Sequence, residues 1–146
     1  MDNATNRVLI QFRDDEGRTE KLWATIVSDG LYQLEHSPSF AYRVSRKDIV
    51  RAVADENGEL LFERIEEKSG NRTVRILFAR YWITSPEAAP ILNKIEELGC
   101  SYEHLEGRML NINVPPAVEL KKLAEYLIDQ GLWWEYADPT RESLFP

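Results

Sequence analysis

The order of hydrophobic and polar positions in the second half of the chain predicts six elements. Apolar residues recur at every second position over residues 73–78, which is typical of a strand. They recur at helical spacing over about residues 86–98 and 116–130. Further extended runs cover residues 101–106, 108–114 and 133–136. Strand, helix, strand, strand, helix, strand is the order of a ferredoxin-like βαββαβ unit, so both helices should cover the same side of one sheet.

The helix ends are marked by residues with known positional preferences. Ser85 and Pro86 suit a helix start, whereas Pro90 requires that the regular helix begins near Ala89 or that its first turn is kinked. Gly99 and Gly131 are well placed to end the two helices. The apolar face of the second helix is expected to consist of Leu120, Leu123, Ala124, Leu127 and Ile128.

The first half contains short strand patterns at intervals of roughly ten residues, separated by turn residues. The strands are expected over residues 7–13, 19–28, 31–35, 49–54 and 60–67. This spacing favours a small antiparallel β-barrel or curled sheet, with Trp23 in its core. We therefore predict an α+β protein with a β subdomain over residues 1–70 and a ferredoxin-like subdomain over residues 71–146. Because the connection is short, the two should pack together and may be counted as one domain.

Composition narrows the class of protein. The 146 residues are 43% hydrophobic, which is enough for a core, and no apolar run is long enough to cross a bilayer. The start of the chain lacks signal-peptide features, and a single Cys100 agrees with a reducing compartment, so a cytoplasmic location is expected. The formal net charge is −7, and both halves are acidic. This balance disfavours nucleic acid as a partner and favours a basic protein.

Motifs for catalysis and cofactors are lacking. No nucleotide-binding loop or zinc motif occurs, and we predict neither a cofactor nor a metal site. Cys100 and His104 have the spacing of two ligands on one strand face, but a buried inert thiol is the more economical interpretation. His36 lies next to Ser37, yet neighbours on an extended chain point apart, so a catalytic dyad is poorly supported. An enzyme would have to use carboxylates, and the sequence selects no pair.

Three places are candidates for binding. Tyr81 and Trp82 follow a predicted strand and precede a helix, where they would either contact a partner or fasten the helix to the β subdomain. Trp133 and Trp134 point to opposite faces of their strand, so one is core and the other is exposed; we take Trp134 as the interface candidate. A basic run is consistent with a site for phosphate or an acidic partner, or with a solvated loop paired with local acids such as Asp48; it consists of Arg43, Arg46, Lys47 and Arg51.

Spaced short matches give the chain a resemblance to a bacterial family, the domain of unknown function 4265. They cover about residues 7–136 and comprise Leu22-Trp23-Ala24, Tyr32-Gln-Leu, Lys47-Asp48-Ile49-Val50, Ser69-Gly70 followed by Thr73-Val-Arg-Ile, Leu98-Gly99-Cys100, Asn113-Val114-Pro115 and Trp134-Glu135-Tyr136. Lys47 stands before Asp48 where the family tends to have glycine. The resemblance implies a small bacterial cytosolic protein without an assigned reaction or catalytic residues, with a buried tryptophan among its shared residues. It also implies a relation to proteins that accompany polymorphic toxins as immunity partners.

These observations lead to two hypotheses of function. The first is a non-enzymatic immunity protein that binds a cognate basic toxin, for example a nuclease, with Trp82 as an anchor. Carboxylates on two turns would steer the encounter; they are Asp14, Asp15, Glu16, Asp55 and Glu56. The second is a small-molecule-sensing or regulatory ferredoxin-like module. The identity of the partner, the surface used and the oligomeric state stay open.

Overall fold

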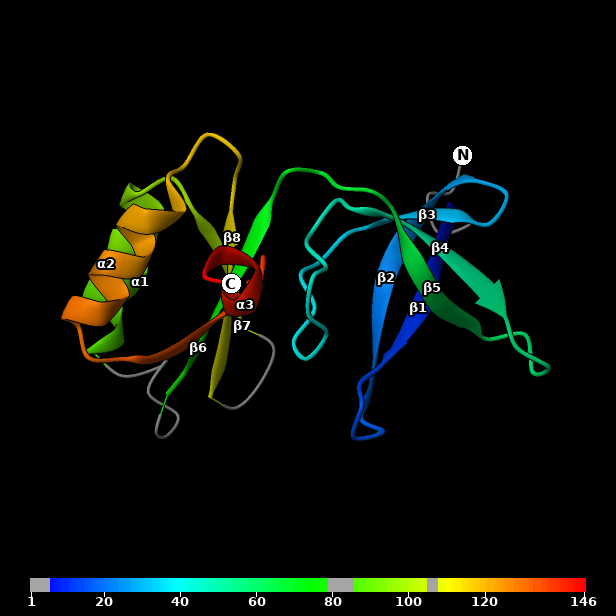
Figure 1. Cartoon of the computed structure of the whole chain (residues 1–146), viewed down its shortest axis with the longest axis horizontal. Coiled ribbons are helices and arrows are strands. Elements are labelled where there is room, and N and C mark those ends of the chain that lie inside the picture. The colour runs from blue at the N-terminus through cyan, green and yellow to red at the C-terminus, as the bar shows by residue number, and fades with distance from the viewer. Residues whose placement is uncertain (1–5, 79–85, 105–107) are drawn as a thin grey trace. The chain divides into compact units, whose positions relative to one another are not determined.

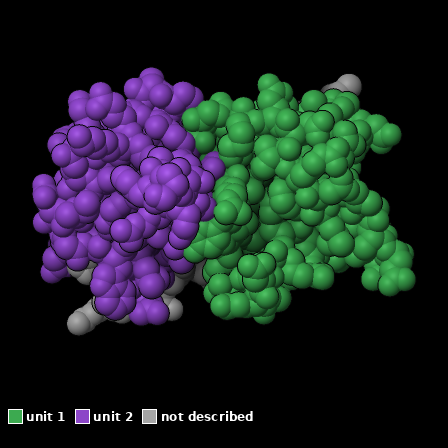
Figure 2. Space-filling model, viewed as in Figure 1, with its two compact units in different colours: residues 1–71 green, residues 72–146 purple. Residues whose placement is uncertain are grey.

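The computed structural model describes residues 6–78, 86–104 and 108–146. The protein is a mixed α+β chain with two compact units, residues 1–71 and 72–146, which are coloured green and purple in Figure 2. Each unit has its own sheet and its own hydrophobic core. No described helix has the length and apolar character that spanning a membrane requires.

Unit 1 is a five-stranded barrel (Figure 1). Its strands are β1 (Arg7–Arg13), β2 (Thr19–Ser28), β3 (Leu31–Leu34), β4 (Ile49–Ala54) and β5 (Leu60–Glu67). Consecutive strands pair antiparallel, as predicted, but β1 and β5 close the barrel in parallel through Ile10–Leu60 and Gln11–Leu61. Because alternate residues of a strand face inward, the core is an alternating set: Ile10, Phe12, Leu22, Ala24, Leu34, Val50 and Ala52, joined by Val44.

The segment between β3 and β4 has little regular structure, and two carboxylates hold it. Asp48 is fully buried; its Oδ2 accepts hydrogen bonds from Ser45 N at 2.8 Å and Lys68 Nζ at 2.7 Å, and its Oδ1 accepts one from Ser69 N at 2.8 Å. Asp48 therefore pairs with Lys68, while Arg51 of the basic run pairs with another acid, Glu66, at 3.7 Å.

The second carboxylate belongs to Glu20, on β2. It accepts hydrogen bonds from three successive backbone amides, those of Ser39, Phe40 and Ala41, at 2.8, 2.8 and 3.0 Å. Unpaired backbone donors are costly once they leave water, so these bonds stabilise one conformation of a segment that has no sheet partner.

Lys47 has a φ of 72°, in the left-handed region that favours glycine. Its side chain is exposed, and its amide donates to Leu34 O at 2.9 Å, which fixes the backbone there. This geometry explains why a glycine suits this position: without a Cβ, a left-handed residue is not strained.

We expect Lys47→Gly to be more stable than Lys47→Ala by about 0.5 to 1 kcal/mol. Relief of about 1 to 2 kcal/mol of left-handed strain is partly offset by the greater freedom of glycine in the unfolded chain. Urea unfolding of the two variants measures the difference, and the alanine variant controls for loss of the lysine side chain. A glycine variant less stable than the alanine variant would contradict the claim that the backbone at Lys47 is strained.

The described residues of unit 2 form a four-stranded sheet and three helices. The elements are β6 (Arg72–Leu77), α1 (Ala88–Glu97), β7 (Ser101–His104), β8 (Met109–Val114), α2 (Leu120–Asp129), β9 (Trp133–Asp138) and α3 (Arg141–Leu144). The strand order is β7-β8-β6-β9, and every neighbouring pair is antiparallel. The helices α1 and α2 lie on the same side of this sheet in Figure 1, and both contribute to one core with β6 and β8.

Most of the predicted helix ends are confirmed. Helix α1 begins at Ala88, next to the predicted start near Ala89, so Pro90 lies in its first turn, where a missing amide hydrogen costs no internal hydrogen bond. Gly99 and Gly131 follow the last residues of the two helices, as expected. Helix α2 begins at Leu120 rather than near residue 116. The guanidinium of Arg72 donates to Pro115 O at 2.7 Å and to Val118 O, and so holds the preceding turn outside the helix.

Ile128 is a correction to the predicted apolar face of α2. Its side chain is 63% exposed, while Leu123 and Leu127 are fully buried. Successive residues of a helix point about 100° apart, so with Leu127 directed into the core its neighbour Ile128 is turned towards the solvent. The short helix α3 was not predicted; Thr140 caps it by accepting a hydrogen bond from Ser143 N at 3.3 Å.

Candidate functional site

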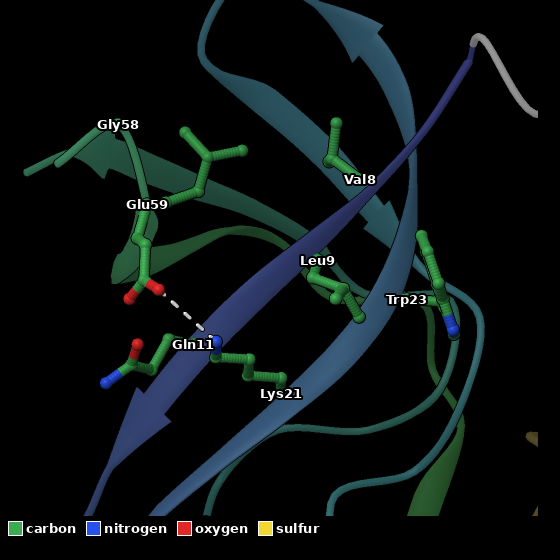
Figure 3. Close-up of a pocket in the computed structure, with 8 residues that line it drawn as sticks. Val8, Leu9, Gln11, Lys21, Trp23, Gly58 and Glu59 are labelled. Carbon is green, nitrogen blue, oxygen red and sulfur yellow. Dashed lines mark hydrogen bonds and ion pairs between the residues drawn. The ribbon is translucent and has the colours of Figure 1, made fainter.

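A pocket of about 390 Å³ lies on the outer surface of the barrel in unit 1 (Figure 3). Residues of β1 and β2 and the start of β5, with the turn before it, form its walls. The lining residues are Val8, Leu9, Gln11, Lys21, Trp23, Gly58, Glu59 and Leu60. The pocket therefore exists because the parallel β1–β5 pair brings the β4–β5 turn beside the first hairpin.

The apolar part of the pocket is a cross-strand pair. Leu9 and Trp23 are direct partners in the β1–β2 ladder, and their side chains are 39% and 40% exposed. Leu22 and Ala24 face the core, so the pleat directs Trp23 outward. The expectation that Trp23 is a core residue is wrong, because strand alternation overrides the general tendency of tryptophan to be buried.

The orientation of Trp23 is fixed by its neighbours. The guanidinium carbon of Arg7 lies 4.4 Å from the centroid of the Trp23 ring, in cation–π geometry. Arg7 in turn donates from Nε and Nη2 to the two oxygens of Glu35, each at 3.0 Å, and Thr25 Oγ1 donates to Glu35 at 3.2 Å. The ring is thus held in place before any ligand arrives, which lowers the entropy cost of binding.

The paired guanidinium of Arg7 lowers the pKa of Glu35 below its ordinary value of 4.5. A carboxylate with a lowered folded-state pKa contributes stability above its unfolded pKa and loses it as the pH falls through the folded value. We therefore expect Glu35→Gln to lower the thermal midpoint at about pH 7, and the difference from wild type to shrink below about pH 4.5. Calorimetric scans across this range measure it. A difference that does not change with pH would contradict this origin.

The polar part of the pocket presents mainly acceptors. Glu59 Oε1 lies 3.3 Å from Lys21 Nζ in an ion pair that Figure 3 marks with a dashed line. Gln11 Oε1 is a buried atom without a hydrogen-bond partner. A buried acceptor without a donor costs free energy, so a donor arriving from outside would be stabilised here.

The acidic residues predicted to steer a partner lie on two turns of the same construction. In the β1–β2 turn Asp14 N donates to Arg18 O at 2.9 Å, and in the β4–β5 turn Asp55 N donates to Glu59 O at 2.8 Å. The carboxylate of each aspartate also accepts hydrogen bonds from two amides of its own turn. Asp14 and Asp55 are thus turn-forming residues.

The outward-facing acids of these turns are the other three candidates. Asp15, Glu16 and Glu56 are exposed, so their charges face the solvent. The turn that carries Glu56 leads directly into the pocket wall at Gly58 and Glu59. Sequence reasoning therefore named residues of a turn that adjoins the pocket but none of the residues that line it.

The other predicted interface residues have different outcomes. Tyr81 and Trp82 lie outside the described residues. Trp134 packs against the core of unit 2 with its ring 4.8 Å from that of Tyr136, whereas Trp133 is 70% exposed. The outward tryptophan of the pair is therefore Trp133, and the choice of Trp134 is corrected. Trp133 borders a second hollow of about 230 Å³ with Arg75, Leu77, Met109, Trp134 and Glu135.

Cys100 and His104 do not form a shared site in the described residues. Cys100 belongs to the core of unit 2, and burial raises the pKa of its thiol, while His104 is exposed. Within residues 6–78, 86–104 and 108–146, no group of three or more histidine, cysteine, aspartate or glutamate side chains is arranged to hold a metal ion.

Comparison with known proteins finds a family to which the chain belongs and a solved structure with a similar fold. No curated protein matches the chain. A solved structure described as a hypothetical protein from Neisseria gonorrhoeae is similar with a TM-score of 0.73 and 24% sequence identity, covering 91% of this chain and 94% of the other. At this identity the likeness shows a shared fold. The family model described as a domain of unknown function (DUF4265) matches residues 20–136, and the chain belongs to that family.

Proposed function

We propose that this chain is a non-enzymatic acidic binding protein of the bacterial cytoplasm that captures a basic protein, and specifically an immunity protein that neutralises a cognate toxin. The observation that carries the proposal is the exposed Leu9–Trp23 pair beside the acidic turn that ends at Glu59. An oriented tryptophan with an acidic border has the character of an interface hot spot for a positively charged partner.

Charge and shape have separate roles in this proposal. The net charge of −7 raises the rate of encounter with a basic protein, and the exposed acids Asp15, Glu16 and Glu56 contribute at the turns. The apolar pair then supplies contact area that leaves water on binding, which slows dissociation. Complex formation should therefore weaken with salt mainly through its association rate.

Co-expression with the product of a neighbouring gene tests the proposal. The wild-type chain is expected to rescue growth from that product and to co-purify with it, and Leu9→Ser is expected to lose both effects. Val53→Ser is the matched control, because Val53 is an exposed aliphatic residue on β4 that does not line the pocket. A wild-type chain that gives neither complex nor rescue would remove the proposal.

A second candidate is supported by unit 2. We propose that it is a ferredoxin-like unit, and the all-antiparallel order β7-β8-β6-β9 with two connecting helices supports this. The hollow beside Trp133 favours a sensing role, since ferredoxin-like units serve many ligands. A rise in thermal midpoint with an amino acid or a nucleotide, lost in Trp133→Ala, would favour sensing. A midpoint unchanged by all of these compounds would contradict it.

A further inference from the structure

The pocket of unit 1 joins an apolar wall to a group of acceptors. Figure 3 shows Val8, Leu9 and Trp23 along one part of it and Gln11, Lys21 and Glu59 along another. An occupant that fits both parts needs an apolar stem and several hydrogen-bond donors at its end. Among the natural side chains, arginine and lysine have this form.

We propose that the pocket receives an arginine side chain of the basic protein partner, with the guanidinium donating to Glu59 and Gln11. This inference deepens the proposed function and rests on it. The stem would lie against Leu9 and Trp23, and the planar head would reach the acceptors beyond them.

The charges in and around the pocket of unit 1 disfavour an anionic occupant. Lys21 is the cation among the lining residues, and it is paired with Glu59 at 3.3 Å. Within the described part of the chain, Glu59 Oε2 accepts no hydrogen bond, and Gln11 Oε1 is buried and accepts none. These two unused acceptor oxygens favour a donor as the incoming group. The adjacent turn adds the negative charge of Asp55 and Glu56, which favours a cation further.

One observation favours a guanidinium over the ammonium of lysine. The acceptors belong to two separate elements, Gln11 to β1 and Glu59 to the turn before β5, and the fork of an arginine can donate to both at once, whereas an ammonium acts as a compact point charge. Arg7 occupies one face of the Trp23 ring at 4.4 Å, so an incoming guanidinium would have to stack on the other face.

The experiment titrates the full chain, labelled with nitrogen-15, with N-acetyl-arginine methylamide. The expected result is saturable shifts of the Trp23 indole and Gln11 side-chain amide resonances. The neutral citrulline analogue, which keeps the shape of arginine, is expected to bind at least about threefold more weakly, as is usual for loss of one exposed ion pair. The lysine analogue is expected to lie between the two.

Variants locate the binding in the pocket. Glu59→Gln and Gln11→Met are each expected to weaken binding of the arginine probe about threefold. Glu67→Gln is the matched control, because it removes the same charge from an exposed glutamate at the end of β5 that does not line the pocket, and it is expected to change nothing. Equal binding of the arginine and citrulline probes, or no shift of the pocket resonances, would overturn the inference.

The two proposals can fail separately. A partner that binds Glu59→Gln as tightly as wild type would overturn the arginine site and leave the proposed function intact. Failure of the wild-type chain to bind any co-expressed partner would overturn the proposed function and, with it, the assignment of the arginine to a partner protein.

Discussion

Replacing Asp48 with alanine is expected to lower the free energy of unfolding of unit 1 by about 2 to 4 kcal/mol, because two backbone amides lose their acceptor at about 1 to 3 kcal/mol each. The carboxylate has no exposed surface and joins three donors, which belong to Ser45, Lys68 and Ser69. The ammonium of Lys68 contributes less to the loss, since it is partly exposed and also donates to Arg43 O at 3.0 Å. Urea unfolding followed by the amide resonances of β4 measures the loss within unit 1.

Two further variants separate the contributions to the Asp48 result. Lys68→Met keeps the two backbone hydrogen bonds but leaves a buried carboxylate without its cation, so it should also lower stability, by about 1 to 3 kcal/mol. Asp15→Ala is the control for an exposed aspartate and should change stability by less than about 0.5 kcal/mol. A loss below about 1 kcal/mol for Asp48→Ala would show that the β3–β4 segment does not depend on this carboxylate.

The elements that sequence reasoning found are those whose signals are local. The strands of unit 1 carry period-two alternation, and their hairpins have an Asp and a Gly at matching positions, as in the turns that begin at Asp14 and Asp55. The two long helices carry an apolar stripe. The start of α2 was placed less well, because it depends on Arg72, which lies more than forty residues earlier in the chain.

The pocket could not be predicted because it depends on one non-local pairing. The parallel contact of Gln11 with Leu61 joins the first strand to the fifth, and no local pattern specifies this register. The burial of Trp23 was also inferred from residue type, although its place between inward Leu22 and Ala24 contained the correct answer. The two-residue period of the strand, applied to Trp23, places its ring on the outer surface of the barrel.

The period of helix α2 determines which of its side chains are buried, and this gives the second large effect on stability. Leu127→Ala is expected to lower the free energy of unfolding of unit 2 by about 3 kcal/mol, because the leucine is fully buried and its removal leaves a cavity. Ile128→Ala, one residue further along α2, is expected to change it by less than about 0.5 kcal/mol, since that side chain is 63% exposed.

This neighbouring pair is a direct test of how α2 meets the sheet. The two substitutions remove similar volumes from the same helix, so differences in helix propensity are small compared with the difference in burial. Hydrogen exchange of amides in β6 and β8 reports unit 2, because both strands contribute to the core that contains Leu127. Equal losses for both variants would mean that α2 is rotated about its axis, with Ile128 on the core side as the apolar pattern alone predicts.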